Sequence, residues 1–244
     1  MMLAFTEIWA GYANTIFYTV AGTLLSLFIT VPAAYALSRK TMPFRKAINT
    51  YLIITMFISG CLIPTYLLVQ SMGLLDTRAI IVILGSVSMW NLIICRTFFD
   101  STIPLELIES ARLDGCDEFR IFFKIVLPLS KAIIAVLTLY FAVARWNSYY
   151  SGLIYLRDQT KWPLQLVLRQ LLNAMHVDAQ EVGDTTERLM EVQSMKYGII
   201  VLASAPVLAM YPFVQMYFVT IIFLWTSSPQ QMEYFNFIIR YHHL

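Results

Sequence analysis

The sequence ESARLDGCDEFRIFFKIVLPLS, Glu109 to Ser130, is the most informative stretch of this 244-residue chain. It holds seven charged residues between Glu109 and Lys124, although only 13% of the chain is charged and 59% is hydrophobic. A composition this apolar leaves too few polar side chains to cover a soluble globule of the same size. We therefore expect a membrane protein in which the charged stretch forms a loop at the membrane surface.

Five apolar stretches on either side of this loop come close to or exceed the roughly 20 residues that a helix needs to cross a bilayer. They cover about residues 14 to 37, 47 to 70, 79 to 95, 131 to 150 and 197 to 225. No solenoid-period repeat and no low-complexity linker interrupts them. The expected fold is all-α, a polytopic membrane helical bundle that forms one domain over residues 1 to 244.

Lysine and arginine gather in two of the connecting loops, which are expected to face the cytoplasm. The first loop carries Arg39, Lys40, Arg45 and Lys46, and the stretch from Arg96 to Lys131 holds five basic residues. The loop over about residues 157 to 196 and the N-terminus are then external. An external N-terminus without a leader is expected where a preceding first helix is missing, which gives an ancestral total of six spans.

Other functional classes find little support in the composition. A net charge of +2, spread over loops, does not suggest nucleic acid as a partner. The three cysteines show no metal-binding spacing and read as apolar fillers. The segment that begins LQLVLRQLL at Leu164 is amphipathic, and it predicts either a helix lying in the outer interface or a docking surface for an external partner.

The charged loop, about residues 101 to 128, predicts two short helices joined by a glycine turn. Pro104 suits the first turn of a helix, and Ser101 and Thr102 are candidate caps. Gly115 is expected to end this helix because glycine adopts the left-handed conformation without steric cost. The second helix is expected to continue until Pro128 opens the next span, with one face made of Phe119, Phe122, Phe123 and Val126.

Six residues of this loop resemble, with the right spacing, the EAA---G---------I-LP motif of permease subunits of bacterial binding-protein-dependent ABC importers. They are Glu109, Ala111, Gly115, Ile125, Leu127 and Pro128. The stretches NTIFYTVAGTLLSLFITVPAAYALSRK, LIPTYLLVQSMGLLDT, WNSYYSGLIYL and WPLQLVLRQLL are similar to carbohydrate permeases of the maltose type, and most to the LplC/YtcP-like branch associated with oligosaccharide uptake. The resemblance covers about residues 8 to 218. The family usually has one more N-terminal helix and a short polar tail, so residues 219 to 244 depart from its pattern.

The resemblance implies a type I ABC importer permease in the bacterial cytoplasmic membrane, crossing it several times, and not an enzyme. The implied partners are a cytoplasmic ATPase dimer, a second homologous permease and an external solute-binding lipoprotein. This chain would bind no cofactor, and ATP and magnesium would bind the ATPase, in keeping with the absence of a GxxxxGK[ST] sequence.

The charged loop would then be the coupling helix, which docks on the ATPase and converts its closure into alternating access. Glu109, Asp117 and Glu118 would contact or face the ATPase, and Gly115 would set the turn. Phe119, Phe122 and Phe123 would anchor the unit, with at least two of the three expected to pack internally.

Candidates for the substrate path come from polar and aromatic residues in the spans. Arg145 is an intramembrane charge and so a functional candidate, although we favour its snorkelling to the outer interface. Its neighbours Trp146, Asn147, Tyr149 and Tyr150 suit sugar stacking and hydrogen bonding, or equally an aromatic belt. Gly60 and Pro64 should bend or break the second span and, with Tyr66, point toward the interior or pore. Trp90 and Asn91 are similar candidates, or Asn91 holds neighbouring helices together.

Three alternatives to a carbohydrate importer differ in what they require of the spans. The same machinery could carry another solute, such as a polyamine or a phosphate-bearing compound, and acidic pore residues would favour the polyamine. An ion-coupled secondary transporter needs ionisable groups at mid-membrane, and an intramembrane enzyme needs a base or metal ligands there. The predicted spans hold no internal Asp or Glu and no HExxH sequence, which disfavours a polyamine importer, an ion-coupled transporter and an enzyme.

Overall fold

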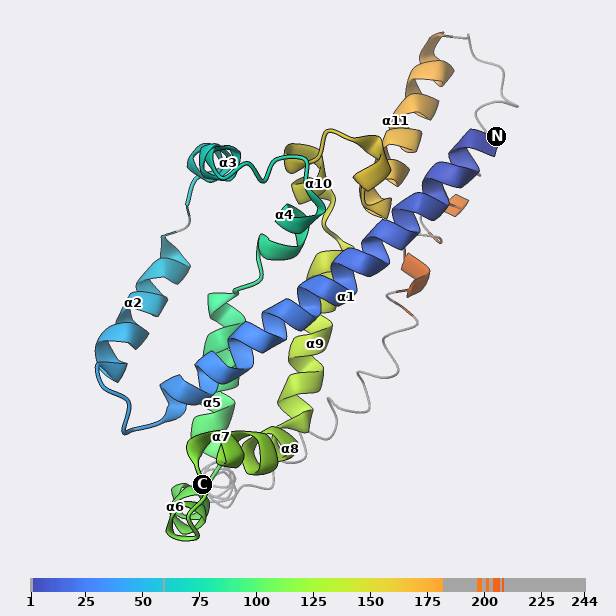
Figure 1. Ribbon diagram of the computed structural model, residues 1–244. Helices are drawn as coiled ribbons and strands as arrows, with labels where there is room; N and C mark the ends of the chain where they lie inside the picture. The colour runs from blue at the N-terminus through green and yellow to red at the C-terminus, as the bar shows by residue number, and fades with distance from the viewer. Residues whose placement is uncertain are drawn as a thin grey trace, which may run out of the picture.

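The computed structural model describes residues 2–58 and 60–181 and, beyond them, residues 197–198, 201, 204–206 and 208. Regular structure in this part of the chain is helical throughout, as expected (Figure 1). The elements in chain order are α1 (Met2–Ser38), α2 (Arg45–Phe57), α3 (Leu62–Ser71), α4 (Arg78–Ile83), α5 (Met89–Thr102), α6 (Leu105–Leu113), α7 (Glu118–Ile121), the π-helix η1 (Phe122–Val126), α8 (Leu127–Leu129), α9 (Lys131–Trp146), α10 (Tyr149–Tyr155), the 3₁₀ turn η2 (Gln159–Lys161) and α11 (Leu164–Glu181).

The long helix α1 is the element against which much of the fold is built (Figure 1). At a rise of 1.5 Å per residue, its 37 residues extend over about 55 Å, more than the apolar thickness of a bilayer. Helices α9, α5, α11 and α4 all contact it. Within the described residues, Glu7–Ser38 of α1 is the one single helix long and apolar enough to cross a membrane.

Two bent helix pairs pass the same test for a membrane span when each pair is taken together. One is Arg45–Phe57 with Leu62–Ser71, bent by 110°, and the other is Glu118–Leu129 with Lys131–Trp146, bent by 79°. The first pair falls in the second expected span. Its interruption lies between Phe57 and Leu62, so the expectation that the helix breaks near Gly60 is confirmed.

The third expected span, about residues 79 to 95, is not one continuous helix. Helix α4 ends at Ile83, and Gly85 follows with a φ of 74°, a conformation that disfavours side chains with a Cβ. Helix α5 then starts at Met89, where Ser88 Oγ accepts the N–H of Asn91 at 3.4 Å. The sequence carries a signal for this break in Gly85, Ser86 and Ser88, which the expectation of one continuous span passed over.

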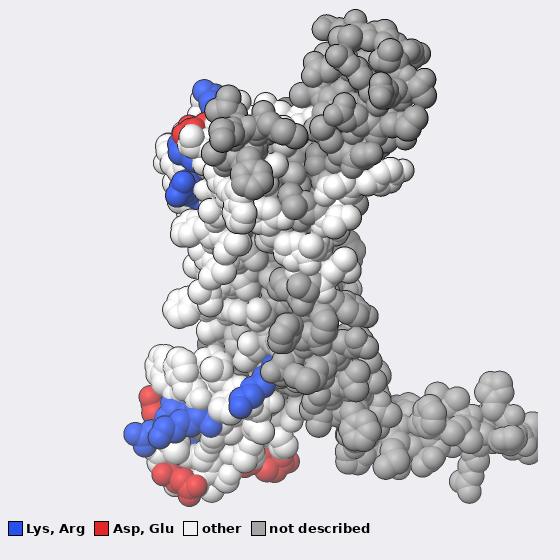
Figure 2. Space-filling view, turned by 90° about the vertical axis from the view of Figure 1, so that its right-hand side faces the viewer, with Lys and Arg blue, Asp and Glu red and all other residues white. Residues whose placement is uncertain are grey.

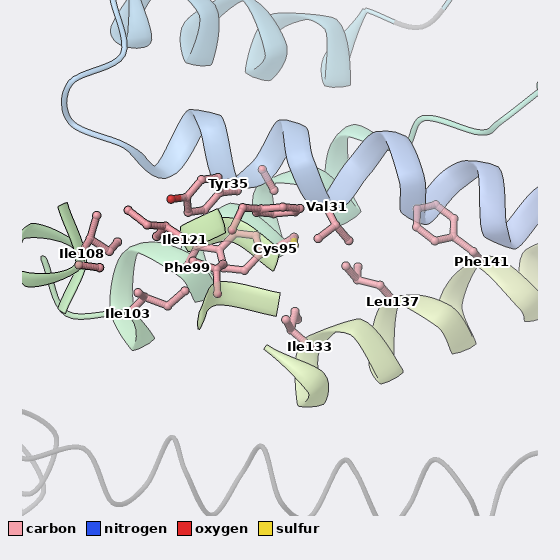
Figure 3. Packing of buried hydrophobic residues seen from close by; sticks show 14 residues of the cluster. Val31, Tyr35, Cys95, Phe99, Ile103, Ile108, Ile121, Ile133, Leu137 and Phe141 are labelled. Carbon is pink, nitrogen blue, oxygen red and sulfur yellow. The ribbon is translucent and has the colours of Figure 1, made fainter. Parts of the chain in front are cut away.

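The largest hydrophobic cluster joins the membrane helices to the charged loop (Figure 3). Val31 and Tyr35 of α1 lie with Cys95 and Phe99 of α5 and Leu137 of α9. The same cluster contains Ile108 and Ala111 of α6 and Ile121, Phe122 and Val126 of the following segment. Because the loop shares one core with the bundle, α6 cannot shift freely against α1 without exposing apolar surface.

The buried side of α1 carries polar side chains at helical spacing: Asn14, Thr15, Thr23, Ser26 and Thr30. The first two of these residues bond the segment that leads into α11. Asn14 Nδ2 donates to Thr160 O at 2.7 Å, and the N–H of Leu164 donates to Thr15 Oγ1 at 2.8 Å. Tyr18 Oη donates to Lys161 O at 2.7 Å in the same region. These bonds hold the segment from Thr160 to Leu164 against α1.

Helix α11 starts as part of this core. Leu164, Val167 and Leu168 are buried, and a Cβ on Gly11 of α1 would lie 3.2 Å from Leu164 Cα. The first turns of α11 therefore pack on other parts of the chain. This contradicts the alternative in which this helix lies free in the outer interface. Most of the fifth expected span, all of residues 219 to 244 and the second half of the external loop lie outside the described residues.

Candidate functional site

Helix α6 begins at Leu105 with Pro104 in the N-cap position and no side-chain capping bond. Ser101 and Thr102 belong to α5, so the expectation that one of them caps α6 is wrong. The reason is that α5 continues to Thr102 and only Ile103 and Pro104 separate the two helices. Glu106 lies in the first turn, where a negative charge is favoured by the helix dipole.

The end of α6 forms a Schellman motif around Gly115. The N–H of Gly115 donates to Arg112 O at 3.0 Å, and the N–H of Cys116 donates to Ala111 O at 3.0 Å. Gly115 has a φ of 77°, which glycine adopts without steric cost. The prediction that Gly115 ends this helix is confirmed.

An ionic contact holds α6 against the segment that follows the turn. Arg112 Nε donates to Glu118 Oε1 at 2.7 Å, and Tyr35 Oη of α1 donates to the other carboxylate oxygen at 3.5 Å. The Arg39 guanidinium lies 4.3 Å from the centre of the Tyr35 ring. Glu118, expected to face a partner, is thus also a link between α6 and the C-terminal end of α1.

The outer side of α6 and its turn is left free of contacts within the described chain. Glu109, Asp114 and Asp117 are exposed, and Leu113, one helical turn after Glu109, has 90% of its surface exposed. Acidic side chains lie at this lower end of the molecule (Figure 2). Sequence reasoning missed Leu113, although its i+4 spacing from Glu109 placed it on the same face.

The three phenylalanines of the loop divide unequally. Phe122 is buried, with its ring centre 5.1 Å from that of Tyr35. Phe119 and Phe123 are 75% and 60% exposed, so the expectation that at least two of the three pack internally is wrong. Within the π-helical turn Phe122–Val126, Phe122 and Val126 are buried, whereas Phe123 lies on the exposed side.

The remaining motif residues Ile125 and Leu127 are half-buried and pack on the same core. Pro128 lies in the first turn of α8, and α9 begins only at Lys131, after the 79° bend. The expectation that Pro128 opens the next span is therefore wrong. The bend falls at Ser130, which separates the two helices.

Arg145 does not snorkel to the outer interface, because its side chain is buried. Its guanidinium donates to the carbonyls of Ile81 and Leu84 and, at 3.1 Å, to Ser86 Oγ. Those carbonyls lack helical partners because α4 ends at Ile83, and the negative end of a helix favours a cation. The snorkelling expectation failed because these acceptors lie about 60 residues away in the sequence.

The other substrate-path candidates are not gathered at one point. Trp146 is buried with Leu164 and Leu168, and Asn147 is exposed, with its Nδ2 donating to Val143 O at 3.0 Å. The centre of the Tyr149 ring lies 4.4 Å from Cζ of the Arg169 guanidinium, which sits over the face of the ring. Tyr150 is 60% exposed.

The candidates of the second and third spans are likewise spread out, and Tyr66 alone among them packs on the cluster around Tyr155. Tyr66 stacks on Tyr155 with ring centres 6.1 Å apart, and Gly60 and Pro64 are exposed in this chain. Asn91 is buried in α5, whereas Trp90 is 60% exposed. Exposed positions of this kind are available to a neighbouring subunit, to lipid or to a solute path.

The connection between α3 and α4 and the segment after α10 together form a compact charge cluster around Asp76. The carboxylate of Asp76 accepts the N–H groups of Arg157 and Asp158, each at 3.1 Å. Lys161 Nζ lies 3.4 Å from Asp76 and 3.3 Å from Asp158. The bond from the Asp158 N–H, with those of Arg157 and Lys161, holds the pKa of Asp76 below its usual value.

No group of three or more His, Cys, Asp or Glu side chains within the described ranges could hold a metal ion. The features that stand out are instead a protruding helix and turn, joined by a common core to α1, and a buried arginine that braces the break between α4 and α5. Neither arrangement supplies a nucleophile or a general base in a pocket.

Comparisons with known proteins agree on one family. The model of the "Binding-protein-dependent transport system inner membrane component" family matches residues 4–175. The chain is 43% identical to Protein LplC of Bacillus subtilis (strain 168) over 205 residues, which is 84% of this chain and 69% of that protein. It is 42% identical to the polygalacturonan/rhamnogalacturonan transport system permease protein YtcP of the same organism, covering 86% and 74% of the two chains.

A solved structure is also similar across most of the chain. It is that of a bacterial ABC transporter involved in the import of the acidic polysaccharide alginate, with a TM-score of 0.76 and 36% sequence identity. The match covers 87% of this chain and 75% of the other.

Proposed function

The chain belongs to the family of binding-protein-dependent transport system inner membrane components, and on that premise we propose that it is a permease subunit of an ATP-driven importer for sugars or oligosaccharides. It supplies membrane helices and no catalytic group. The energy comes from ATP hydrolysis, with ATP and magnesium bound by a separate ATPase subunit.

The observation that carries the proposal is the exposed outer side of α6 on a firmly anchored helix. Ile108 and Ala111 fasten α6 to the core, whereas Glu109 and Leu113 point away from it. A short helix with a buried back and an unpartnered front suits the task of receiving a force from another subunit. Coupling requires such an element, because both sites must be able to bias its position.

The mechanism follows from what α6 is tied to. Closure of an ATPase dimer displaces α6, and the Arg112–Glu118–Tyr35 contacts together with the shared core pass this displacement to α1. Helix α9 receives it across the 79° bend. The membrane helices then exchange inward for outward access.

The proposed assembly contains three further kinds of subunit. A second homologous permease completes the pore, two ATPases act on the two coupling helices, and an external solute-binding lipoprotein delivers the solute. This arrangement places the chain in the bacterial cytoplasmic membrane and requires it to cross that membrane several times. Helix α1 supplies one of the proposed crossings, and each of the two bent pairs contributes helices to a further one.

Support for a carbohydrate solute comes from two of the relatives named above, the polygalacturonan/rhamnogalacturonan permease protein and the transporter involved in alginate import. In this chain, Tyr66, Tyr149 and Asn147 are proposed to contact the solute because aromatic rings stack on sugars and amides bond hydroxyls. Asn91, Gly60 and Pro64 are proposed to shape the path. Arg145 is proposed to support its wall, since its donors are already engaged with α4 and Ser86.

The proposal is tested by purifying the chain together with its ATPase from membranes. Glu109→Lys reverses a charge on the exposed front of α6 and is expected to remove the ATPase from the purified complex and abolish ATP-dependent sugar uptake. Glu7→Lys makes the same change at an exposed position near the N-terminal end of α1, away from α6. It should leave ATPase binding and sugar uptake unchanged. A purified, ATPase-free form that still carries out uptake would overturn the proposal.

A further inference from the structure

The segment from Glu118 to Leu129 lies at 79° to α9, the helix that it leads into. If α9 runs across the membrane as proposed above, this segment lies nearly parallel to the membrane surface at the cytoplasmic end. One side of it is buried, because Ile121, Phe122 and Val126 belong to the core that contains Ile108 and Phe99. The opposite side is open.

The open side carries two adjacent rows with different chemistry. Phe119 and Phe123 form one row at i, i+4 spacing, with 75% and 60% of their surfaces exposed. Arg120 and Lys124 form the neighbouring row and are exposed as well. Neither cation makes an ion pair with any residue in the described part of the chain.

Exposed aromatic rings beside unpaired cations match the requirements of the zone between lipid headgroups and acyl chains. The rings enter the apolar edge while the cations reach the phosphates, as in helices that lie in a membrane interface. Leu129, 53% exposed, and Lys131 extend the same pattern to the start of α9. A water-filled cytoplasm would leave both phenylalanines without a favourable environment.

The rest of the loop has the opposite charge. The open residues of α6 and its turn include Glu106, Glu109, Asp114 and Asp117. An anionic membrane surface repels these residues and attracts Arg120 and Lys124. The charge distribution therefore assigns the α6 front to a protein partner and the Phe119–Lys131 side to lipid.

We propose that the exposed side of Phe119–Lys131 binds anionic phospholipids of the inner leaflet and thereby sets the height of α6 relative to the membrane. This inference rests on the proposed placement of the chain in the cytoplasmic membrane. It assigns Phe119 and Phe123 to the membrane interface and Arg120 and Lys124 to lipid phosphates.

The first test uses the whole transporter, with its partner subunits, in nanodiscs of phosphatidylcholine with increasing phosphatidylglycerol. ATPase activity is expected to rise with the phosphatidylglycerol fraction. The double change Arg120→Gln/Lys124→Gln should raise the fraction needed for half-maximal activity by about fivefold or more, the effect of losing at least one surface cation. Arg78→Gln, which removes an exposed cation in the loop proposed to be external, should leave it unchanged. An unchanged phosphatidylglycerol requirement in the double variant would overturn the proposal.

The second test reads the environment of position 123 and needs no transport activity. Phe123→Cys, in a Cys61→Ser/Cys116→Ser chain, is labelled with a polarity-sensitive fluorophore. Its emission should be blue-shifted in nanodiscs without the ATPase and should remain so when the ATPase is added. A shift that appears only with the ATPase would show a protein contact and overturn the proposal. Because this readout is independent of uptake, it separates failure of the lipid inference from failure of the proposed importer function.

Discussion

Gly22 of α1 faces the buried guanidinium of Arg145 at a distance that leaves no room for a side chain. A Cβ on Gly22 would lie 2.8 Å from Arg145 Nε and 3.1 Å from Cδ and Cζ. The guanidinium cannot move aside without leaving the carbonyls of Ile81 and Leu84. Gly22 is thus part of the same structural unit as the break between α4 and α5.

Gly22→Ala is expected to destabilise the fold. The added methyl group displaces Arg145 from its acceptors, and overpacking of this kind typically costs about 1–3 kcal/mol. Thermal unfolding of the detergent-solubilised protein measures the change. Gly198→Ala serves as the control because a Cβ at Gly198 meets no atom of the described residues within 4 Å. Equal unfolding temperatures for the two variants would contradict the prediction.

Arg145→Lys is expected to destabilise the protein even though it keeps the charge. A single ammonium group cannot reach both carbonyls and Ser86 Oγ in the geometry of the guanidinium. Each buried group left unpaired costs roughly 1–3 kcal/mol. Arg78→Lys, at an exposed position, should have no effect.

Ser86→Ala should cost less in the Arg145→Lys protein than in the original chain, because the bond between the two side chains is already lost. The expected difference is about 0.5–3 kcal/mol, the range found for residues in direct contact. It is obtained from the unfolding free energies of the two single variants and the double variant. Strict additivity would show that the two residues act independently.

Gly115→Ala is expected to weaken the turn after α6. The positive φ of Gly115 costs a residue with a Cβ roughly 1–2 kcal/mol. Open space surrounds the position, so strain in the backbone and not a clash is the cause. Uptake should fall more than ATP hydrolysis, since a loosened turn transmits less displacement. Gly115→Asn should recover much of the loss, because asparagine tolerates this conformation better.

Acidification is expected to reduce the stability that the Asp76 and Asp158 carboxylates contribute to the folded protein. Hydrogen bonds lower the pKa of Asp76 and of Asp158, the latter chiefly through Thr160, so both carboxylates stabilise the folded state while ionised. This contribution is complete above the unfolded-state pKa of about 3.9 and is lost as the pH falls through the lower folded-state value. Unfolding measured between pH 7 and pH 2 should show the loss. Asp76→Asn should reduce its pH dependence.

The sequence was informative where a local rule decides the structure. Gly115 ends α6 because its own backbone adopts a positive φ, and the second span breaks near Gly60, as the glycine in the apolar run indicated. Arg145 and the phenylalanines were different. The acceptors of Arg145 exist only because α4 ends at Ile83, and Phe119 and Phe123 are exposed because the core covers the side of the helix that carries Phe122 and Val126. Such facts depend on contacts distant in sequence, which no periodicity reports.

Helix α1 also has a bearing on timing. Asn14 and Thr15 bond the outer loop near one end, and Tyr35 bonds Glu118 near the other. One helix without a chain break joins these two places, with Pro32 as an interior point where a backbone hydrogen bond is missing. A stiff element of this length moves at both ends together. In the proposed importer, α1 would therefore link the movements of its two ends directly, and Pro32 is the point at which bending would let them differ.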